Sequence, residues 1–180
     1  YLIGTMNTAD RSLAGLDIAL RRRFTFKEML PQPQLLDGVS VGGVDIGQLL
    51  RVMNQRIEVL LDREHCLGHA YFMPLLKTSS LAQLELIFRN QVLPLLQEYF
   101  FEDWQRIQWV FNDHRKPLAD CFVRRKNLDL NLLFGGGVPA QDQVWRINEL
   151  AFSRASAYAG VIVCKAVADT SIESYEGPEV

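Results

Sequence analysis

The 180-residue sequence has few of the features that mark secreted, membrane-spanning or polyanion-binding proteins. Its three cysteines lie far apart, at positions 66, 121 and 164, so neither a disulfide framework nor a Cys-x-x-Cys metal site is expected. No apolar run approaches the roughly 20 residues of a membrane-spanning helix. The net charge of -2 gives no overall positive field for nucleic acid. No signal-peptide pattern is present, and we expect a cytoplasmic protein without membrane association.

The first 30 residues have the pattern of an α/β sheet protein. Residues 1–5 form a short apolar run typical of a buried strand, and residues 7–12 are a polar loop. Leu13, Leu16 and Leu20 recur at helical spacing before three arginines, whose charge suits a helix C-terminus. Residues 24–26 alternate like a second strand. This order of strand, helix and strand predicts a βαβ unit.

Residues 45–113 have the pattern of a small helical domain, which follows an expected linker over residues 31–44. Apolar residues recur at helical spacing over 46–61 and 81–99, and Pro94 is expected to kink or split the second helix. Residues 104–111 predict a third, shorter helix. The fold class is therefore α/β plus α.

Residues 114–180 are expected to form a C-terminal extension of unknown role. Alternating leucines at 128, 130 and 132 are consistent with a strand, and residues 143–154 are predicted to be helical. A small apolar segment follows, and the tail from Asp169 is expected to be loose.

The strongest candidate site lies around the polar loop and the arginines. Asn7 follows the first strand, where α/β sheets bind ligands, and its amide can orient a water beside a phosphate. Arginines such as Arg22 and Arg23 can neutralise charge on a transferring phosphoryl group. The same residues also fit a structural role, in which Asn7 and Asp10 cap a turn and the arginines form a solvated helix end.

Three sequence blocks resemble the McrB family of AAA+ NTPases, the motor subunits of modified-cytosine-dependent restriction systems. The first block is Ile3–Ser12 together with Ala19–Phe24, the second is Leu67–Met73, and the third is Leu95–Asp103. All three occur in the family's order, and the resemblance covers residues 1 to about 113. It implies that residues 1–30 are the end of an AAA+ α/β core and that residues 45–113 are the helical lid.

The resemblance also implies roles for single residues. Asn7 looks like the sensor-1 asparagine, which orients the attacking water and contacts the terminal phosphate, and Asp10 belongs to the same loop. Arg22 and Arg23 match the family's arginine pair, which acts as fingers in the neighbouring subunit's site; Arg21 is a weaker candidate. His69 falls near the position where AAA+ lids place a sensor-2 group that contacts the nucleotide.

The implied activity is hydrolysis of GTP or ATP with Mg²⁺. The resemblance further implies a ring, a hexamer in this family, a McrC-like nuclease partner, and contact with DNA through other domains. Two alternatives remain open at this point. The chain could belong to a MoxR-like or dynein-like AAA+ chaperone, or it could be a non-catalytic assembly module.

One departure from the family is large. The sequence contains no G-x-x-x-x-G-K-[ST] and no apolar strand that ends in Asp-Glu, so the phosphate cradle and the Mg²⁺ ligands are missing. In the family these segments lie upstream of the sensor-1 strand. We therefore expect the chain to be the C-terminal part of a longer protein, and to bind nucleotide poorly and hydrolyse none in isolation.

Two further clusters carry weaker signals. His65, Cys66 and His69 have metal-ligand types but lack a fourth partner nearby, so no metal site is expected. Arg124, Arg125 and Lys126 could contact DNA phosphates. Three charges add little affinity at physiological salt, so the sequence favours a solvated face.

Overall fold

The computed structural model describes residues 2–5, 22–126, 128, 135 and 144–163. Helices make up most of it: α2 (Ile46–Leu60), α3 (Leu81–Ile87), α4 (Leu93–Tyr99), α5 (Trp104–Phe111) and α7 (Ala155–Ile162). Shorter helical turns are η2 (Pro33–Leu36), η3 (Arg63–His65), η4 (His69–Leu76), η5 (Phe88–Val92), η6 (Asp113–Arg115), η7 (Leu118–Asp120) and η8 (Glu149–Ala151). Two antiparallel ribbons pair β1 (Ser40–Val41) with β2 (Val44–Asp45), and β3 (Val123–Arg125) with β4 (Trp145–Ile147).

Helix α2 confirms the helix predicted over residues 46–61. It begins at Asp45, whose side chain accepts a hydrogen bond from the Gln48 backbone N–H at 2.8 Å and so satisfies one of the free donors of the first turn. Its apolar stripe is buried, and Leu49, Met53 and Ile57 have no exposed surface. The stripe fixes which face of the helix lies against the core.

The second predicted helix is split by a π-helical turn, as the proline suggested. Helix α3 continues through η5 into α4, and the Leu93 backbone N–H donates to the Phe88 carbonyl, five residues back. Pro94 has no N–H and its ring would clash with the carbonyl four residues earlier, so a wider turn here relieves the clash.

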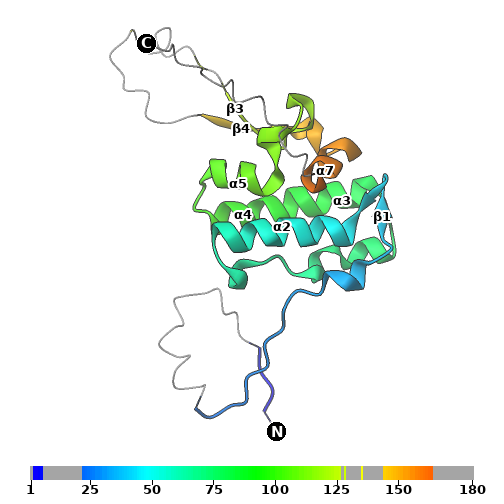
Figure 1. Cartoon of the computed structure of the whole chain (residues 1–180), viewed down its shortest axis with the longest axis vertical. Coiled ribbons are helices and arrows are strands. Elements are labelled where there is room, and N and C mark those ends of the chain that lie inside the picture. The colour runs from blue at the N-terminus through cyan, green and yellow to red at the C-terminus, as the bar shows by residue number, and fades with distance from the viewer. Residues whose placement is uncertain (1, 6–21, 127, 129–134, 136–143, 164–180) are drawn as a thin grey trace, which may run out of the picture.

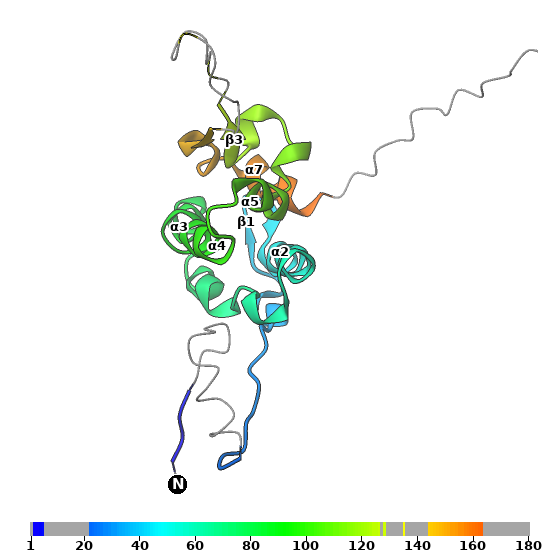
Figure 2. The same cartoon turned by 90° about the vertical axis from the view of Figure 1, so that its left-hand side faces the viewer.

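The helices enclose one core (Figures 1 and 2). Figure 2 views α2 and the α3–α4 pair along their axes, with α5 and α7 packed over them. Aromatic rings fill the centre: the ring of Phe88 lies 4.8 Å from that of Tyr158 and 5.7 Å from that of Phe122. Phe72 and Phe111 pack on Phe88 from two other elements. The core therefore depends on contacts between segments far apart in sequence.

Most hydrophobic residues of the expected linker lie in this core, whereas Leu35 is exposed. Leu36, Val41 and Val44 are buried, and Val39 is nearly so. The glycines and prolines that suggested a linker form the turns instead: Gly42 and Gly43 have positive φ at the tip of the β1–β2 hairpin.

The core also continues past residue 113, where the sequence predicted a domain boundary. Asp113 and Lys116 form a buried ion pair at 2.9 Å, with 0% and 2% of their side chains exposed. Asp113 also accepts the backbone N–H of Val123 at 2.8 Å. Phe122, Val123 and residues of α7 are buried with the helices of the lid. The boundary stays a prediction, but one core lies on both sides of it.

Asn112 closes the end of α5 and links it to α7. Its φ of 61° is left-handed, a conformation that asparagine tolerates at helix ends. Its side-chain amide donates to the carbonyls of Gly160 and Val163 at 2.9 and 3.1 Å. This buried amide therefore links the end of α5 to the end of α7.

Five predicted elements differ from the structure or lie outside the described residues. Residues 2–5 and 24–26 form no strand, because a strand needs a neighbour and no described segment pairs with them in a ladder. The helix predicted over 143–154 is wrong: residues 145–147 form β4, because β3 pairs with them across the fold. The predicted helix within residues 6–21 and most of the strand over 128–132 lie outside the described residues.

Within the described parts of the chain, the helices are too short or too polar to cross a bilayer.

Candidate functional site

The structure describes three of the five predicted site residues. Arg22 and Arg23 are exposed and lie in a turn. His69 begins η4 on the lid. Asn7 and Asp10 lie outside the described residues, as does Arg21. The roles of all these residues stay predictions.

A strap, defined as residues 28–37, joins the arginine turn to the lid. Three side-chain interactions hold it. Glu28 pairs with Arg63 and Asp37 pairs with Arg51. Between them, the backbone N–H of Gln32 donates to Nδ1 of His69 at 3.0 Å. Exposed ion pairs contribute little alone, so Leu36, which is fully buried, supplies the main anchor.

The strap passes close to the first turn of α2, where Gly47 makes the approach possible. A Cβ added at Gly47 would lie 3.2 Å from the carbonyl oxygen of Pro33 and 3.0 Å from the carboxylate of Asp37. A side chain there would push the strap away from the helix. The lid surface and the strap therefore fit each other closely at this point.

The bond to His69 defines the proton position on its ring. Because Nδ1 accepts a hydrogen bond from Gln32, a neutral ring carries its proton on Nε2. The predicted contact of His69 with nucleotide is not tested by this geometry. What the geometry shows is that His69 positions the strap.

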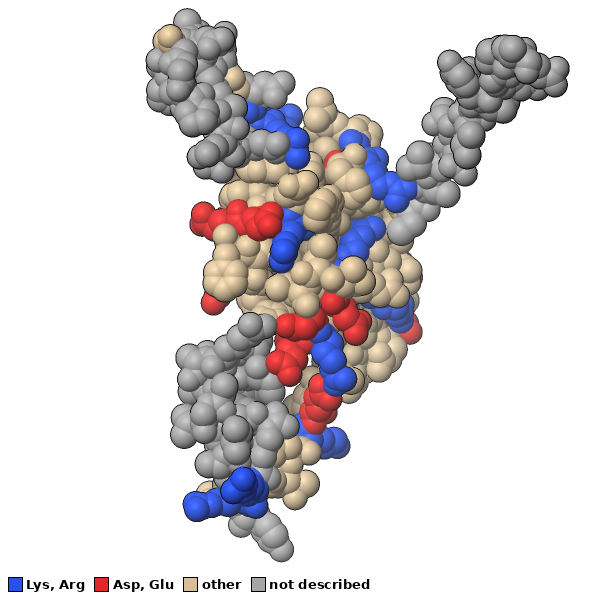
Figure 3. Space-filling model, turned by 60° about the vertical axis from the view of Figure 1, so that its left-hand side comes forward, with Lys and Arg blue, Asp and Glu red and all other residues tan. Residues whose placement is uncertain are grey.

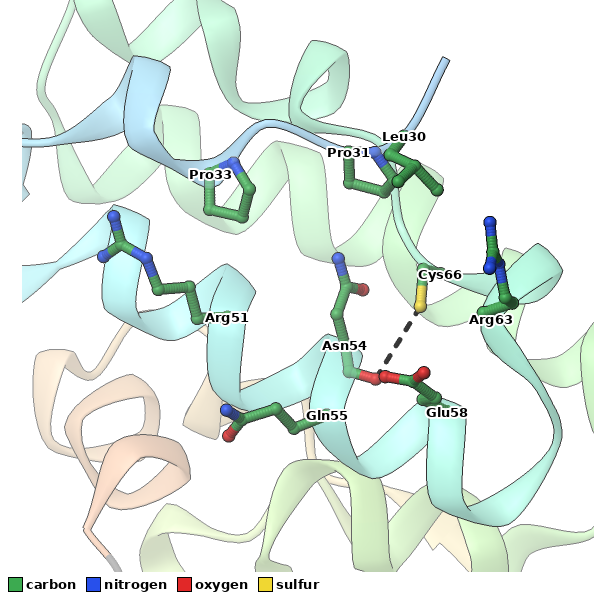
Figure 4. Close-up of a pocket in the computed structure, with 9 residues that line it drawn as sticks. All are labelled: Leu30, Pro31, Pro33, Arg51, Asn54, Gln55, Glu58, Arg63 and Cys66. Carbon is green, nitrogen blue, oxygen red and sulfur yellow. Dashed lines mark hydrogen bonds between the residues drawn. The ribbon is translucent and has the colours of Figure 1, made fainter. Parts of the chain in front are cut away.

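A pocket of about 370 Å³ lies between the strap and α2 (Figure 4). Leu30, Pro31 and Pro33 form its strap side. Its helix side carries polar and charged groups: Arg51, Asn54, Gln55 and Glu58, with Arg63 and Cys66 at one end. Arg51 and Arg63, at either end, are the same residues that bind the strap. The pocket therefore depends on the position of the strap.

Asn54 is a structural residue of this site that sequence reasoning does not identify. Its amide nitrogen donates to the Leu67 carbonyl at 3.0 Å, and its amide oxygen accepts the Leu67 N–H at 2.7 Å. Both bonds are buried. They fix the turn that leads into His69. A signal is present, since Asn54 follows Leu50 by four residues and precedes Ile57 by three, which places it on the buried stripe of the helix.

Replacing Asn54 by alanine is expected to destabilise the chain by about 2–3 kcal/mol, because it leaves two buried backbone groups of Leu67 without partners. The neighbouring substitution Gln55→Ala, at an exposed position of the same helix, is the control and should change stability by less than about 0.5 kcal/mol. Urea unfolding followed by circular dichroism measures both. Equal losses in the two variants would remove Asn54 from this role.

The residues of the metal candidate have other partners. His65 Nδ1 lies 2.7 Å from the Asp62 carboxylate, and its ring meets Tyr99 edge-on at 4.8 Å. The Cys66 thiol donates to the Asn54 carbonyl at 3.8 Å, and burial raises its pKa. Over the described ranges, no group of three or more His, Cys, Asp and Glu side chains is placed to hold a metal ion.

The arrangement is suited to position the arginine turn relative to the lid. The strap connects the two in sequence and is held to α2 and η4 by the contacts above. The position of the strap is therefore set by contacts with the helical body. The pocket beneath it combines two arginines and a carboxylate with amide and apolar groups.

Comparison with known proteins adds two findings. Residues 45–108 match the family model described as "McrB, alpha-helical lid domain". A protein of Escherichia coli (strain K12), the "Type IV methyl-directed restriction enzyme EcoKMcrB subunit", is 38% identical over 126 residues. The match covers 61% of this chain and 28% of the E. coli protein, so the chain spans little more than a quarter of that relative.

Proposed function

We propose that this chain, whose residues 45–108 match the McrB helical lid domain, forms the lid and the adjoining sensor-1 and arginine-finger part of an AAA+ motor subunit. Residues 1–30 are the end of the α/β core in this proposal. Asn7 orients the attacking water, Asp10 supports the same loop, and Arg22 and Arg23 reach the site of the neighbouring subunit.

The observation that carries the proposal is the strap. The arginine turn precedes it directly, and the strap is held to the family-matched lid by Leu36, His69 and two ion pairs. A trans-acting arginine must be held at a defined position to reach the neighbouring site, and in this proposal the strap holds it relative to the lid. The chain supplies that positioning with its own residues.

The substrate in this proposal is GTP or ATP with Mg²⁺. The described residues fit this only in part, because Arg51 and Arg63 can contact phosphate, whereas the sequence has no phosphate-binding P-loop and no Asp-Glu pair for Mg²⁺. We therefore assign the cradle and the metal ligands to sequence outside these 180 residues. The complete motor subunit is this chain joined to those segments.

The wider setting is proposed from the named relative. The E. coli protein is a subunit of a methyl-directed restriction enzyme. For this chain we propose the same class of role: a ring of subunits, a hexamer by family resemblance, that hydrolyses nucleotide and works with a McrC-like nuclease on DNA.

Replacing Asn7 by alanine tests the catalytic part of the proposal. In the complete motor subunit, turnover should fall by about 10²-fold or more while nucleotide affinity changes little, because the amide acts on the attacking water. Steady-state hydrolysis and equilibrium binding of a fluorescent nucleotide measure the two quantities. A loss confined to affinity would show that Asn7 only binds substrate.

A further inference from the structure

The β3–β4 ribbon leaves the helical body as an arm, outside the residues that match the lid family model (Figures 1 and 3). Its register pairs Arg124 with Arg146 and Arg125 with Trp145. The ribbon continues one step further, since the Lys126 N–H donates to the Val144 carbonyl at 2.7 Å. Figure 3 shows Lys and Arg side chains over the upper part of the described surface.

The register separates the side chains into two faces. Residues directly opposite each other, and residues two apart on one strand, point to the same side of a ribbon. Arg124, Lys126 and Arg146 therefore share one face. The opposite face carries Val123, which is buried in the core, and Trp145, whose ring lies 5.3 Å beneath the Arg125 guanidinium. The cationic face is the one that points away from the core.

The charges on this face have no compensating acid within the described chain. The described acidic residues nearest to the two strands in sequence have arginine partners outside the ribbon. Asp120 pairs with Arg154, and Glu149 pairs with Arg89. No carboxylate of the described residues pairs with Arg124, Lys126 or Arg146.

Arg124 and Arg146 form a like-charge pair directly across the two strands. Such pairs have their Cβ atoms about 5 Å apart and destabilise the sheet. Nothing in the packing requires two arginines here, because Arg146 is exposed. An anion that lies over the face would bond both guanidinium groups and turn the repulsion into attraction.

We propose that this face binds the phosphate backbone of duplex DNA. A two-stranded ribbon fits the width of the major groove, and arginine and lysine side chains that flank it can reach phosphates on either side. The choice of DNA over other polyanions rests on the proposed function in DNA restriction; the phosphate recognition rests on the ribbon alone. The net charge of -2 makes a local cluster necessary for such binding.

The strand pairing enlarges the basic cluster that the sequence shows at residues 124–126, because it adds Arg146. In the sequence, three consecutive cations favour a solvated face because three charges add little affinity, whereas the paired ribbon carries four cations, three of them on one face. The pairing with β4 adds Arg146 to the face of Arg124 and Lys126, across a gap of about 20 residues. The resulting face is set by strand register and could not be predicted from sequence spacing.

The test uses the full 180-residue chain, without nucleotide, and a fluorescein-labelled duplex of about 30 base pairs. Fluorescence anisotropy gives the affinity at several salt concentrations. The triple variant Arg124→Gln, Lys126→Gln, Arg146→Gln should bind at least about tenfold more weakly at low salt. Its slope of log affinity against log salt should be smaller in magnitude by about 0.9 for each phosphate that the variant no longer neutralises.

A matched control removes three exposed cations elsewhere: Lys77→Gln, Arg106→Gln, Arg115→Gln. Both triple variants have the same net charge, so an equal loss of binding in the two would assign the effect to overall charge and overturn the proposal. Unchanged binding in the ribbon variant would also overturn it. A competition experiment gives a third contradicting result. If polyglutamate of equal charge displaces the labelled DNA as readily as unlabelled duplex does, the face accepts any polyanion and the proposal is wrong.

The outcome is separable from that of the proposed motor function. DNA binding is measured without nucleotide, whereas the Asn7 test measures hydrolysis. If the ribbon variant binds DNA normally but Asn7→Ala lowers hydrolysis, the motor assignment stands without the ribbon contact. If the ribbon variant loses DNA binding but Asn7→Ala leaves hydrolysis unchanged, the ribbon is a DNA contact of a non-catalytic module. Far-UV circular dichroism of the ribbon variant should match that of the unsubstituted chain, because the three side chains lie outside the core.

Discussion

Replacing Arg23 by alanine in the complete motor subunit is expected to lower nucleotide hydrolysis by about 10³- to 10⁵-fold while nucleotide affinity stays within a few fold. An arginine finger neutralises charge that develops on the transferring phosphoryl group, and its loss has effects of this size. Binding is spared because the finger belongs to the neighbouring subunit and contacts the transition state more strongly than the ground state. Hydrolysis of radiolabelled GTP and ATP measures the effect.

The control for this prediction is Arg106→Ala, at an exposed position of α5 far along the chain. It removes one positive charge without touching the arginine turn, and its turnover should match that of the unsubstituted subunit. If Arg22→Ala, and not Arg23→Ala, gives the large loss, the finger is the first arginine of the pair. If neither changes hydrolysis, the pair is a solvated helix end.

Lys116→Met is expected to destabilise the chain by about 3–5 kcal/mol at neutral pH, because it leaves the buried Asp113 carboxylate without its counterion. Burial already raises the pKa of Asp113 and lowers the pKa of Lys116, against the attraction between them. Neither charge is favourable here by itself. Each charge is stabilised by the other, and the Val123 N–H also donates to the Asp113 carboxylate. Chemical unfolding at pH 7 measures the loss.

The pH dependence of this variant has a definite sign. Without Lys116, the folded-state pKa of Asp113 rises further above its value of about 3.9 in the unfolded chain. Between these two pKa values the folded state binds the extra proton, so stability falls as pH rises and returns on acidification, at about 1.4 kcal/mol per pH unit. In Asp113→Asn, Lys116→Met the amide is neutral, and most of the loss should be recovered at pH 7. A double variant as unstable as the single one would show that packing of the Lys116 chain, and not charge, is what matters.

The buried pair has a clear structural consequence. Asp113 ends the region that the sequence predicts as the lid, and its carboxylate binds the backbone of β3 beyond it. Cys121 lies between, and burial raises the pKa of its thiol to about 11, so it stays protonated and inert at neutral pH. The ribbon that we propose as a DNA contact is thus attached to the lid through buried bonds.

Sequence reasoning succeeds where structure is local. Helix α2 is predictable because its cap, Asp45, and its apolar stripe act within a few residues of each other. The interruption near Pro94 is predictable from the chemistry of one ring. The family blocks predict the lid, and residues 45–108 match the model of the McrB helical lid domain.

Sequence reasoning fails where distant segments decide the structure. The Trp145–Ile147 segment is wrongly predicted as helix because nothing local shows its pairing with β3. The strap resembles a linker because its anchors, Arg51 and His69, lie elsewhere in the chain. The sequence places Asn54 on the buried stripe of α2 but does not reveal its partner, because that partner is the backbone of Leu67.

The most direct test of the account is a mixing experiment with two inactive forms of the complete motor subunit. One form carries Arg23→Ala and the other carries a substitution of its P-loop lysine. In a mixed ring, the intact nucleotide site of the first form receives Arg23 from a neighbouring subunit of the second. The account predicts that the mixture regains hydrolysis that neither form has alone. A mixture as inactive as its components would show that Arg23 does not act in the site of a neighbouring subunit.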